Sequence, residues 1–363
     1  MVRRVAIVGA GLIGGSIGLA LTRAGAVVRG LDADPERAEA AVAMGAMADV
    51  ATSIVDVVHG ADVVIVATPV GTVAEVVIEA LDAGAAVVTD VGSVKAPILR
   101  EVEQARPELA PRFLGGHPMA GSEQDGLEGA DADLFAGATW VLTPTGRTAP
   151  DAHTEVRSLI AELGAEIIEV TPGHHDAMVA VVSHVPQLAA TTLMDVAATT
   201  GEEHSILLRL AAGGFRDMTR IAAGHPGIWP DICIANRDAI VAGLDDYLRA
   251  LAVVRGFVAA GDGDALLHVL ERARSARRNL PRRAGVEGPL VELRVPVPDR
   301  PGVLAEITML AGRLGVNIAD LEIAHSMEGE AGVIVMVVPE DGVAAFEAGL
   351  TDAGYHPARS ALP

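Results

Sequence analysis

Val5-Ala6-Ile7-Val8-Gly9-Ala10-Gly11-Leu12-Ile13-Gly14-Gly15-Ser16 is the stretch that decides the fold of the first half of the chain. A short apolar run leads into glycines spaced as G-x-G-x-x-G, and a helical pattern of apolar residues continues to Leu21. In a strand-turn-helix context, such glycines let backbone N–H groups approach a pyrophosphate at the positive end of the helix. The stretch therefore predicts a Rossmann-like dinucleotide site, although a tight turn without a ligand uses the same residues.

An acidic residue follows at the distance that this kind of site requires. The second expected strand, residues 26–31, ends in Asp32, which follows Gly14 by 18 positions (32 minus 14); the usual offset is about 20 residues. A carboxylate there meets the ribose hydroxyls and repels a 2′-phosphate, so we expect NAD as the cofactor and not NADP. The residues assigned to the cofactor are Gly9, Gly11, Leu12, Ile13, Gly14, Asp32, Thr68 and Pro69.

The α/β alternation continues as far as residue 172. Further strands are expected at residues 62–67, 86–89, 139–142 and 166–170, with helices at 35–44, 73–81 and 153–163. The strands are nearly continuous apolar runs, which is typical of a parallel sheet covered on both faces. Ligands bind at the carboxyl ends of such strands, so residues 67–70 and 90–95 should line the nicotinamide end. We expect residues 1–172 to form one NAD-binding, doubly wound domain.

Composition limits the partners that the chain can have. Its 363 residues are enough for two or three domains, and 50% of them are hydrophobic, which supplies a core for each. Lys and Arg number 27 against 48 Asp and Glu, a formal net charge of -21. This balance argues against nucleic acid and against anionic membrane surfaces as partners. An anionic substrate must therefore meet a local basic pocket.

Cysteine usage and the N-terminus indicate the compartment. The single Cys233 cannot form an intrachain disulfide, and no Cys/His cluster predicts a metal site, which fits a reducing cytoplasm. We interpret Cys233 as a small buried hydrophobe. The apolar run after Arg3-Arg4 imitates a secretory signal, but glycines interrupt it, and no window offers about 18 uninterrupted apolar residues. We expect a cytoplasmic protein that does not associate with membranes.

The stretch Gly115-Gly116-His117-Pro118-Met119-Ala120-Gly121-Ser122-Glu123 is where we expect the chemistry. Pro118 pushes the preceding residue out of the α region, so His117 should be presented from a loop whose glycines let the backbone turn closely around a ligand. A histidine titrates near neutrality and can take a proton from a substrate hydroxyl. The alternative is a histidine that only caps a neighbouring carbonyl group. Ser93 could likewise be only the N-cap of the helix that follows it.

From residue 173 to residue 286 the pattern is that of an all-helical domain. Helical periods cover residues 178–199, 240–257 and 264–278, and no convincing strand is present. Too many positions are apolar for solvated single helices, so the helices should pack against each other and against a second subunit. We therefore expect a homodimer.

Two polar stretches interrupt this helical domain. One surrounds His184, and the other, residues 213–222, contains Arg220, whose guanidinium can clamp a carboxylate with two parallel hydrogen bonds. Arg220 could instead pair with Asp217, and His184 could be a satisfied core histidine. Trp229 follows shortly after Arg220 and could form a wall of the pocket.

The end of the chain predicts a third domain. Residues 279–288 have the composition of a linker, and residues 290–363 show the order β-α-β-β-α-β of a ferredoxin-like module. Pro301 and Gly302 stand at a helix start, where free backbone N–H groups can bind a small carboxylate. A purely structural turn would also explain them.

Together these motifs resemble the prephenate and arogenate dehydrogenase family of tyrosine biosynthesis, with a C-terminal ACT-type regulatory domain. The resemblance covers nearly the whole chain and rests on GAGLIGGS, DVGSVK, GGHPMAGSE, SHVPQ and GGFRDMTRIA occurring in this order. It implies that His117 is the catalytic histidine and that Ser93 orients the ring hydroxyl of the substrate. It also implies a pocket of Arg220, His184, Trp229 and Glu123, with Arg220 on a substrate carboxylate, and an amino-acid site at Gly302 and Asn317.

The activity that this resemblance implies is NAD-dependent oxidative decarboxylation of prephenate to 4-hydroxyphenylpyruvate, with tyrosine as the expected inhibitor bound by the ACT-type domain. The nearest alternative is an arogenate dehydrogenase, which forms tyrosine directly. An acidic residue in the pocket would favour the ammonium group of arogenate, and Asp125 is a candidate for it. A third possibility is an amino-acid-sensing regulatory protein that keeps NAD only as a structural ligand.

Overall fold

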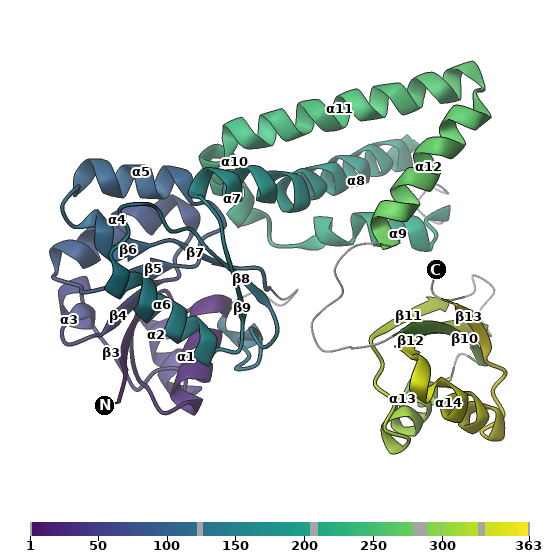
Figure 1. Cartoon of the computed structure of the whole chain (residues 1–363), viewed down its shortest axis with the longest axis horizontal. Coiled ribbons are helices and arrows are strands. Elements are labelled where there is room, and N and C mark those ends of the chain that lie inside the picture. The colour runs from purple at the N-terminus through teal and green to yellow at the C-terminus, as the bar shows by residue number, and fades with distance from the viewer. Residues whose placement is uncertain are drawn as a thin grey trace. The chain divides into compact units, whose positions relative to one another are not determined.

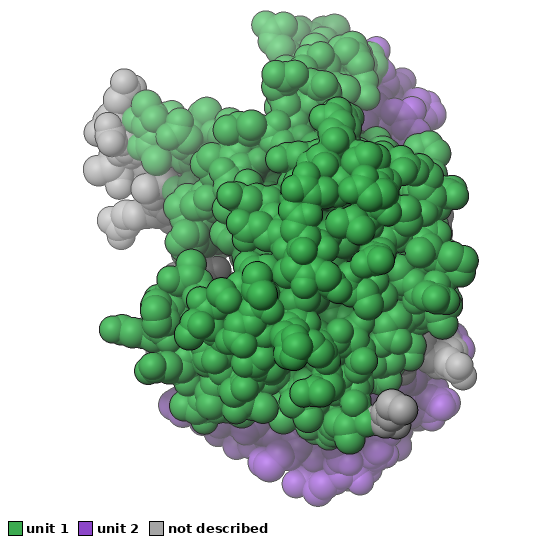
Figure 2. Space-filling model, turned by 90° about the vertical axis from the view of Figure 1, so that its left-hand side faces the viewer, with its two compact units in different colours: residues 1–260 green, residues 261–363 purple. Residues whose placement is uncertain are grey.

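The computed structural model describes residues 2–121, 126–203, 210–278, 289–298, 300–325 and 331–361. The chain forms two compact units, residues 1–260 and 261–363, which Figure 2 colours separately. Figure 1 labels their helices and strands.

A parallel sheet is the centre of the first unit. Its six strands, in the order β3-β2-β1-β4-β5-β6, are those of a Rossmann fold. The strands are β1 (Arg4–Val8), β2 (Val27–Leu31), β3 (Asp49–Val50), β4 (Val63–Val66), β5 (Val88–Asp90) and β6 (Phe113–Leu114). The order reverses between β1 and β4, so the carboxyl ends of these two strands open the crevice where such sheets bind ligands.

Helices cover both faces of this sheet (Figure 1). They are α1 (Leu12–Arg23), α2 (Pro35–Ala43), α3 (Ile54–Val58), α4 (Val70–Asp82) and α5 (Ala96–Ala105). Alternate residues of β1 enter opposite cores: Val5 and Ile7 belong to one apolar cluster, and Ala6 and Val8 to the other. The continuous apolar runs in the sequence thus follow from burial on both faces, as predicted.

The turn between β1 and α1 depends on two glycines. Gly9 has φ of +104°, a conformation that side chains disfavour, and a Cβ there would overlap the carbonyl of Ala67 at the end of β4. A Cβ on Gly14 would overlap the carbonyl oxygen of Gly9. These contacts let α1 start directly against the strand ends.

A second, three-stranded sheet flanks the Rossmann sheet. It consists of β7 (Gly116–Pro118), β8 (Thr139–Leu142) and β9 (Glu166–Glu169), and α6 (Pro150–Glu162) lies between β8 and β9 in the chain. Strand β7 pairs antiparallel with β8, with His117 opposite Val141. The prediction that a loop presents His117 is therefore wrong, because Gly116 and Pro118 adopt an extended conformation that pairs with a neighbouring strand.

The described part of residues 172–260 consists of helices joined by short turns, without a strand. The elements are α7 (Pro172–Val179), the π-helical turn η3 (Ala180–His184), α8 (Val185–Glu203), α9 (Gly213–Thr219), η5 (Arg220–Ala223), η6 (Pro226–Ile228), α10 (Trp229–Ala235) and α11 (Arg237–Ala260). Helix α7 contacts α5, and α10 contacts α4, so this segment packs on the carboxyl-end side of the sheet domain within the same unit. The all-helical prediction is confirmed for the described part of this segment.

One described helix, Pro172–Thr200, is long and apolar enough to cross a membrane by length and composition alone. It also carries His175, Asp176 and His184, whose side chains are buried inside the unit. Polar contacts therefore occupy one face of this helix.

The second unit contains α12 (Gly263–Arg278) and the predicted β-α-β-β-α-β module. Its elements are β10 (Leu290–Pro298), α13 (Val303–Arg313), β11 (Asp320–His325), β12 (Ala331–Pro339), α14 (Glu340–Asp352) and β13 (Ala358–Ala361). The strands form one antiparallel sheet in the order β11-β12-β10-β13, and α13 and α14 share a separate apolar core with it. The predicted linker, residues 279–288, lies outside the described residues.

Candidate active site

Strand β7 brings His117 to the carboxyl end of β5. A Cβ on Gly116 would lie 2.8 Å from the carbonyl oxygen of Asp90 and 2.9 Å from Nε1 of Trp140. The backbone N–H of Gly116 donates to Oδ1 of Asp90 at 3.2 Å. Only glycine fits this close approach, so His117 stands beside the edge of the sheet where doubly wound folds bind ligands.

The imidazole of His117 begins a chain of buried polar groups. Its Nδ1 lies 2.8 Å from Nε2 of His175, and Nδ1 of His175 lies 2.8 Å from Oδ1 of Asp176. The two imidazole rings meet edge to face, with centroids 5.1 Å apart. His117 therefore does not merely cap a carbonyl group, because its Nδ1 contacts a second histidine that is itself bound to a carboxylate.

Asp176 is fixed by the start of helix α5. Its Oδ1 accepts from the backbone N–H of Lys95 and its Oδ2 from that of Ala96, both at 2.8 Å. A carboxylate is favourable at the positive end of a helix. Ser93 is thus not the N-cap of α5, because the helix starts at Ala96 with Lys95 as its N-cap residue, and Asp176 binds its first N–H groups from a distant part of the chain.

A buried ion pair lies on the other side of this turn. The ammonium of Lys95 contacts Oδ2 of Asp90 and donates to the carbonyl oxygen of Gly116 at 2.8 Å. Burial lowers the pKa of Lys95, and the charge of Asp90 opposes this shift. The pair ties β7 to β5, which holds the residue next to His117 in place.

The surroundings of His117 favour its neutral form. Burial lowers the pKa of His117 well below its usual value, and the positive charge of Lys95 acts in the same direction, followed by those of His175 and His184. A neutral imidazole has one nitrogen with a lone pair, so it can accept a proton.

His184 lies at the far end of the same network. The Nδ2 group of Asn236 donates to the carbonyl oxygen of Asp176 at 2.9 Å and contacts Nδ1 of His184 at 3.2 Å. Because an amide nitrogen only donates, Nδ1 of His184 accepts, and its proton is on Nε2. Burial lowers the pKa of His184 to about 4. Its ring meets Trp229 edge to face, with centroids 6.2 Å apart.

The crevice at the ends of β1, β2 and β4 fits a dinucleotide. A Cβ on Gly11 would meet no described atom within 4 Å, so the start of α1 is open, and no side chain caps this helix in the described structure. The carboxylate of Asp32 accepts from the backbone N–H groups of Ala10, at 2.6 Å, and Asp34, at 2.9 Å, and keeps further lone pairs for hydroxyl donors.

Two hydroxyl groups near this crevice are buried without a partner in the described part of the chain. Among the described residues, none forms a hydrogen bond with Oγ1 of Thr68 or with Oγ of Ser93. Buried hydroxyls are normally hydrogen-bonded, so each is suited to a group of a bound molecule. Both follow strand ends, as the sequence predicted.

The remaining predicted site residues either lie outside this network or lie outside the described residues. Arg220 is exposed at the start of η5, and Glu123 and Asp125 lie outside the described residues. In the second unit, Gly302 has φ of +94° and is the N-cap residue of α13, whereas Asn317 is exposed between α13 and β11. Cys233 is half-buried in α10, so it is less enclosed than predicted, and burial raises the pKa of its thiol.

Several residues of the network were not predicted from the sequence: Asp90 and Lys95 as an ion pair, and His175, Asp176 and Asn236 as partners of the two histidines. One signal for His175 and Asp176 is their position as adjacent polar residues in an otherwise apolar helical stretch. No local pattern indicates which distant group they meet.

In the described part of the chain, no group of three or more His, Cys, Asp or Glu residues is arranged to hold a metal ion.

Comparison with known proteins identifies the family. Residues 17–169 match the family model described as prephenate dehydrogenase, nucleotide-binding domain, and residues 171–272 match its dimerization domain. Residues 293–347 match an AHAS small subunit-like ACT domain. The chain is thus a dehydrogenase of the Rossmann type with a helical dimerization domain and an ACT-like domain.

Individual relatives show which dehydrogenases of this class the chain resembles. A prephenate dehydrogenase of Bacillus subtilis (strain 168) is 34% identical over 336 residues, which are 91% of this chain and 90% of the relative. The chain belongs to the prephenate dehydrogenase family. The crystal structure of the prephenate dehydrogenase from Aquifex aeolicus in complex with hydroxyphenyl propionate and NAD+ is 30% identical, with a TM-score of 0.72, and the match covers 77% of this chain and 99% of that one. The crystal structure of Synechocystis arogenate dehydrogenase is 29% identical, with a TM-score of 0.66. This match covers 76% of this chain and 99% of that one.

Proposed function

We propose that this protein is an NAD-dependent prephenate dehydrogenase that forms 4-hydroxyphenylpyruvate. The observation that carries this proposal is the neutral imidazole of His117, bound through Nδ1 to His175 and placed at the ligand-binding edge of the Rossmann sheet. The family membership and the names of the relatives support the choice of substrate.

Asp32, Thr68, Pro69 and the residues of the Gly9–Gly14 turn would hold NAD, which would supply the hydride acceptor when bound. Nε2 of His117 accepts the proton of the ring hydroxyl, and Ser93 Oγ hydrogen-bonds the same hydroxyl and orients it. As the carbinol carbon gives up its hydride to the acceptor, the ring oxygen becomes a carbonyl oxygen. The bond between the ring and its carboxylate then breaks, CO2 departs, and the electron pair of that bond makes the ring aromatic. Nε2 of His117 returns the proton to the ring oxygen, which becomes the hydroxyl group of the product. Because aromatisation is strongly favourable, the enzyme chiefly aligns the reactants and polarises the hydroxyl group.

The substrate carboxylate needs a cation in a protein with a net charge of -21. We assign this role to Arg220, whose guanidinium can form paired hydrogen bonds with a carboxylate. His184 and Trp229 complete the pocket, and the proton on Nε2 of His184 can be donated to an oxygen of the substrate side chain. Glu123 is proposed to order the pocket.

A spectrophotometric assay tests the proposed activity. Purified protein given prephenate and NAD+ should form NADH and 4-hydroxyphenylpyruvate. The His117→Asn variant should lose turnover by about 10²- to 10⁴-fold, the usual contribution of a general base, and should bind NAD+ as the native protein does. Absence of NADH with both prephenate and arogenate would disprove the proposed activity.

Arogenate is the second candidate substrate, and the similarity to Synechocystis arogenate dehydrogenase favours testing it. The two substrates differ only in the side chain, where arogenate carries an ammonium group in place of the keto oxygen. The ratio of kcat/KM for the two substrates decides between them, and we expect prephenate to be preferred.

We propose that the ACT-like domain binds an amino acid, tyrosine in the first place, and that binding lowers the activity. The match to an ACT domain model and the left-handed Gly302 at the start of α13 support this site. The Asn317→Ala variant should keep its basal activity and lose inhibition by tyrosine. Unchanged inhibition in this variant would place the effector elsewhere.

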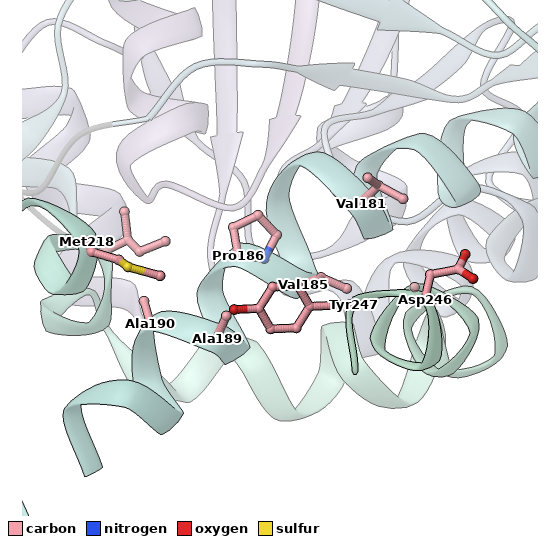
Figure 3. Close-up of a pocket in the computed structure, with 10 residues that line it drawn as sticks. Val181, Val185, Pro186, Ala189, Ala190, Met218, Asp246 and Tyr247 are labelled. Carbon is pink, nitrogen blue, oxygen red and sulfur yellow. The ribbon is translucent and has the colours of Figure 1, made fainter. Parts of the chain in front are cut away.

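We propose a cytoplasmic homodimer. The match to a dimerization domain supports the dimer. So does an apolar pocket between α8 and α11, lined by Val185, Pro186, Ala189 and Tyr247 among others (Figure 3). The single cysteine supports the reducing compartment.

A further inference from the structure

We infer that His175 and Asp176 form a positioning pair that keeps the imidazole proton of His117 on Nδ1, so that Nε2 faces the substrate with a free lone pair. The inference rests on the proposed function of His117 as a base. It assigns to two residues of the helical domain a role in a proton transfer at the sheet domain.

The tautomers of His175 and His117 follow from the hydrogen-bond chain, starting at its fixed end, the carboxylate of Asp176. The carboxylate of Asp176 can only accept, so Nδ1 of His175 donates to it. Nε2 of a neutral His175 is then an acceptor and binds Nδ1–H of His117. The remaining nitrogen of His117, Nε2, carries the lone pair. If the direction of the chain were reversed, Nε2 of His117 would hold a proton and could not act as a base.

Asp176 is rigid enough to impose this direction. Both of its carboxylate oxygens accept backbone N–H groups of the α5 start, and its own carbonyl oxygen accepts from Asn236. Its side chain is 7% exposed and that of His175 is 1% exposed. The polar atoms of the pair are thus held by the backbone and shielded from water, which strengthens the electrostatic interaction between them.

The pair also has an effect during the proposed reaction. When Nε2 of His117 takes the hydroxyl proton, the ring becomes an imidazolium that keeps its bond from Nδ1 to His175. The charged groups that face His117 are Lys95, His175 and His184, all of which oppose this positive charge when protonated. Asp90 is paired with Lys95, so Asp176 is the carboxylate that the hydrogen-bond chain connects to the new charge.

A purely structural role is the competing explanation, because Asp176 also caps α5. Two substitutions of His175 separate the roles. In His175→Leu the acceptor for His117 is lost while the cap from Asp176 can remain. In His175→Gln the side-chain carbonyl can accept from Nδ1–H of His117 and the amide can donate to Asp176. The matched control is His174→Gln, at the exposed neighbouring histidine of α7.

The experiment measures steady-state kinetics and the ¹⁵N resonances of the histidine side chains in the full-length protein. The His117 resonances are those that are absent from the spectrum of His117→Asn. We expect the proton of His117 on Nδ1 in the native protein and in His175→Gln, and a mixture of tautomers in His175→Leu. The kcat of His175→Leu should fall by about 10²-fold with KM for prephenate and NAD+ nearly unchanged. His175→Gln should recover most of this loss, and His174→Gln should behave as the native protein.

The inference would be overturned by the proton of native His117 on Nε2, or by a kcat of His175→Leu equal to that of the control. A fall in kcat equal in His175→Leu and His175→Gln, with an unchanged His117 tautomer, would show that the pair is only structural and would also overturn it. If the native protein does not oxidise prephenate or arogenate but His175→Leu changes the tautomer as expected, the positioning inference is supported and the proposed function fails.

Discussion

At the scale of single residues, the proposed role of His117 as a base makes a prediction about the pH dependence of the activity. A base must be unprotonated, and burial together with the neighbouring charge of Lys95 keeps the pKa of His117 well below 6.5. We therefore expect kcat/KM to stay level as the pH falls from 8 through 6.5, and to decline only in more acidic solution. The pH profile of NADH formation measures this directly. A decline centred at about 6.5, the ordinary value for histidine, would contradict the arrangement described above.

His184 makes a prediction about stability. Its pKa is about 4 in the folded protein and about 6.5 in the unfolded chain, so the unfolded state binds the proton first as the pH falls. Stability that is present above pH 6.5 is then lost between about 6.5 and 4, by up to about 3 kcal/mol. Urea unfolding across this range should show a smaller loss in His184→Gln than in the native protein. His174→Gln, at an exposed position, should retain the native pH dependence.

The sequence predicted some of these residues and not others, for a physical reason. His117 and Ser93 stand in short glycine-containing stretches after strands, so their chemistry and their place in the chain can be recognised together. His175, Asp176 and Asn236 gain their roles only when α7 and α10 pack against α4 and α5. Contacts between segments more than 50 residues apart leave no periodic pattern in the sequence.

At the scale of elements, the start of α1 should separate cofactor binding from folding. A Cβ at Gly14 overlaps the carbonyl of Gly9, whereas one at Gly11 meets no described atom within 4 Å. Gly14→Ala should therefore lower the melting temperature strongly, by an overpacking cost of about 1–3 kcal/mol or more. Gly11→Ala should melt as the native protein does and bind NAD+ at least about tenfold more weakly, because its methyl group takes the space of the pyrophosphate. Thermal melts and NAD+ titrations of both variants measure these effects, and native affinity in Gly11→Ala would remove the turn from the cofactor site.

Long and periodic elements were predicted best. Strands β1, β2, β4 and β5, helices α1, α8 and α11 and the β-α-β-β-α-β module follow from continuous apolar runs or helical period. The two-residue strands β3 and β6 were not predicted, because two residues are too short to show a pattern. Strand β7 was missed because three residues that begin with glycine and end with proline have no strand pattern, and only pairing with β8 makes them extended. The π-helical turn at Ala180–His184 has no signal in residue type either.

At the scale of the whole molecule, the exposed apolar residues of α11 should mediate dimerization. Val241, Leu248, Leu251, Val253 and Val258 of this helix are each at least half exposed, which is unusual for a helix in a monomer. Leu251→Asp should shift the protein from dimer to monomer in sedimentation velocity, because a carboxylate would have to be buried in the interface. Arg255→Ser, at another exposed position of α11, should remain dimeric. A dimeric Leu251→Asp would show that α11 is not in the interface.

The predicted domain boundaries, residues 1–172, 173–286 and 290–363, remain a proposal about independent units. The family models match residues 17–169, 171–272 and 293–347, while spatial compactness groups residues 1–260 together. The two divisions differ because a segment can match a separate family model and still pack against its neighbour in one compact unit.

The helix cap that Asp176 provides for α5 has a consequence for protein engineering. A chimera that joins the sheet domain of this chain to the helical domain of a relative at residue 171 would bring in a foreign partner for the N–H groups of Lys95 and Ala96. Such a recombinant would work only when the donor carries an acid at the equivalent place. A crossover after residue 176, about one turn inside α7, would keep Asp176 together with the start of α5 that it caps.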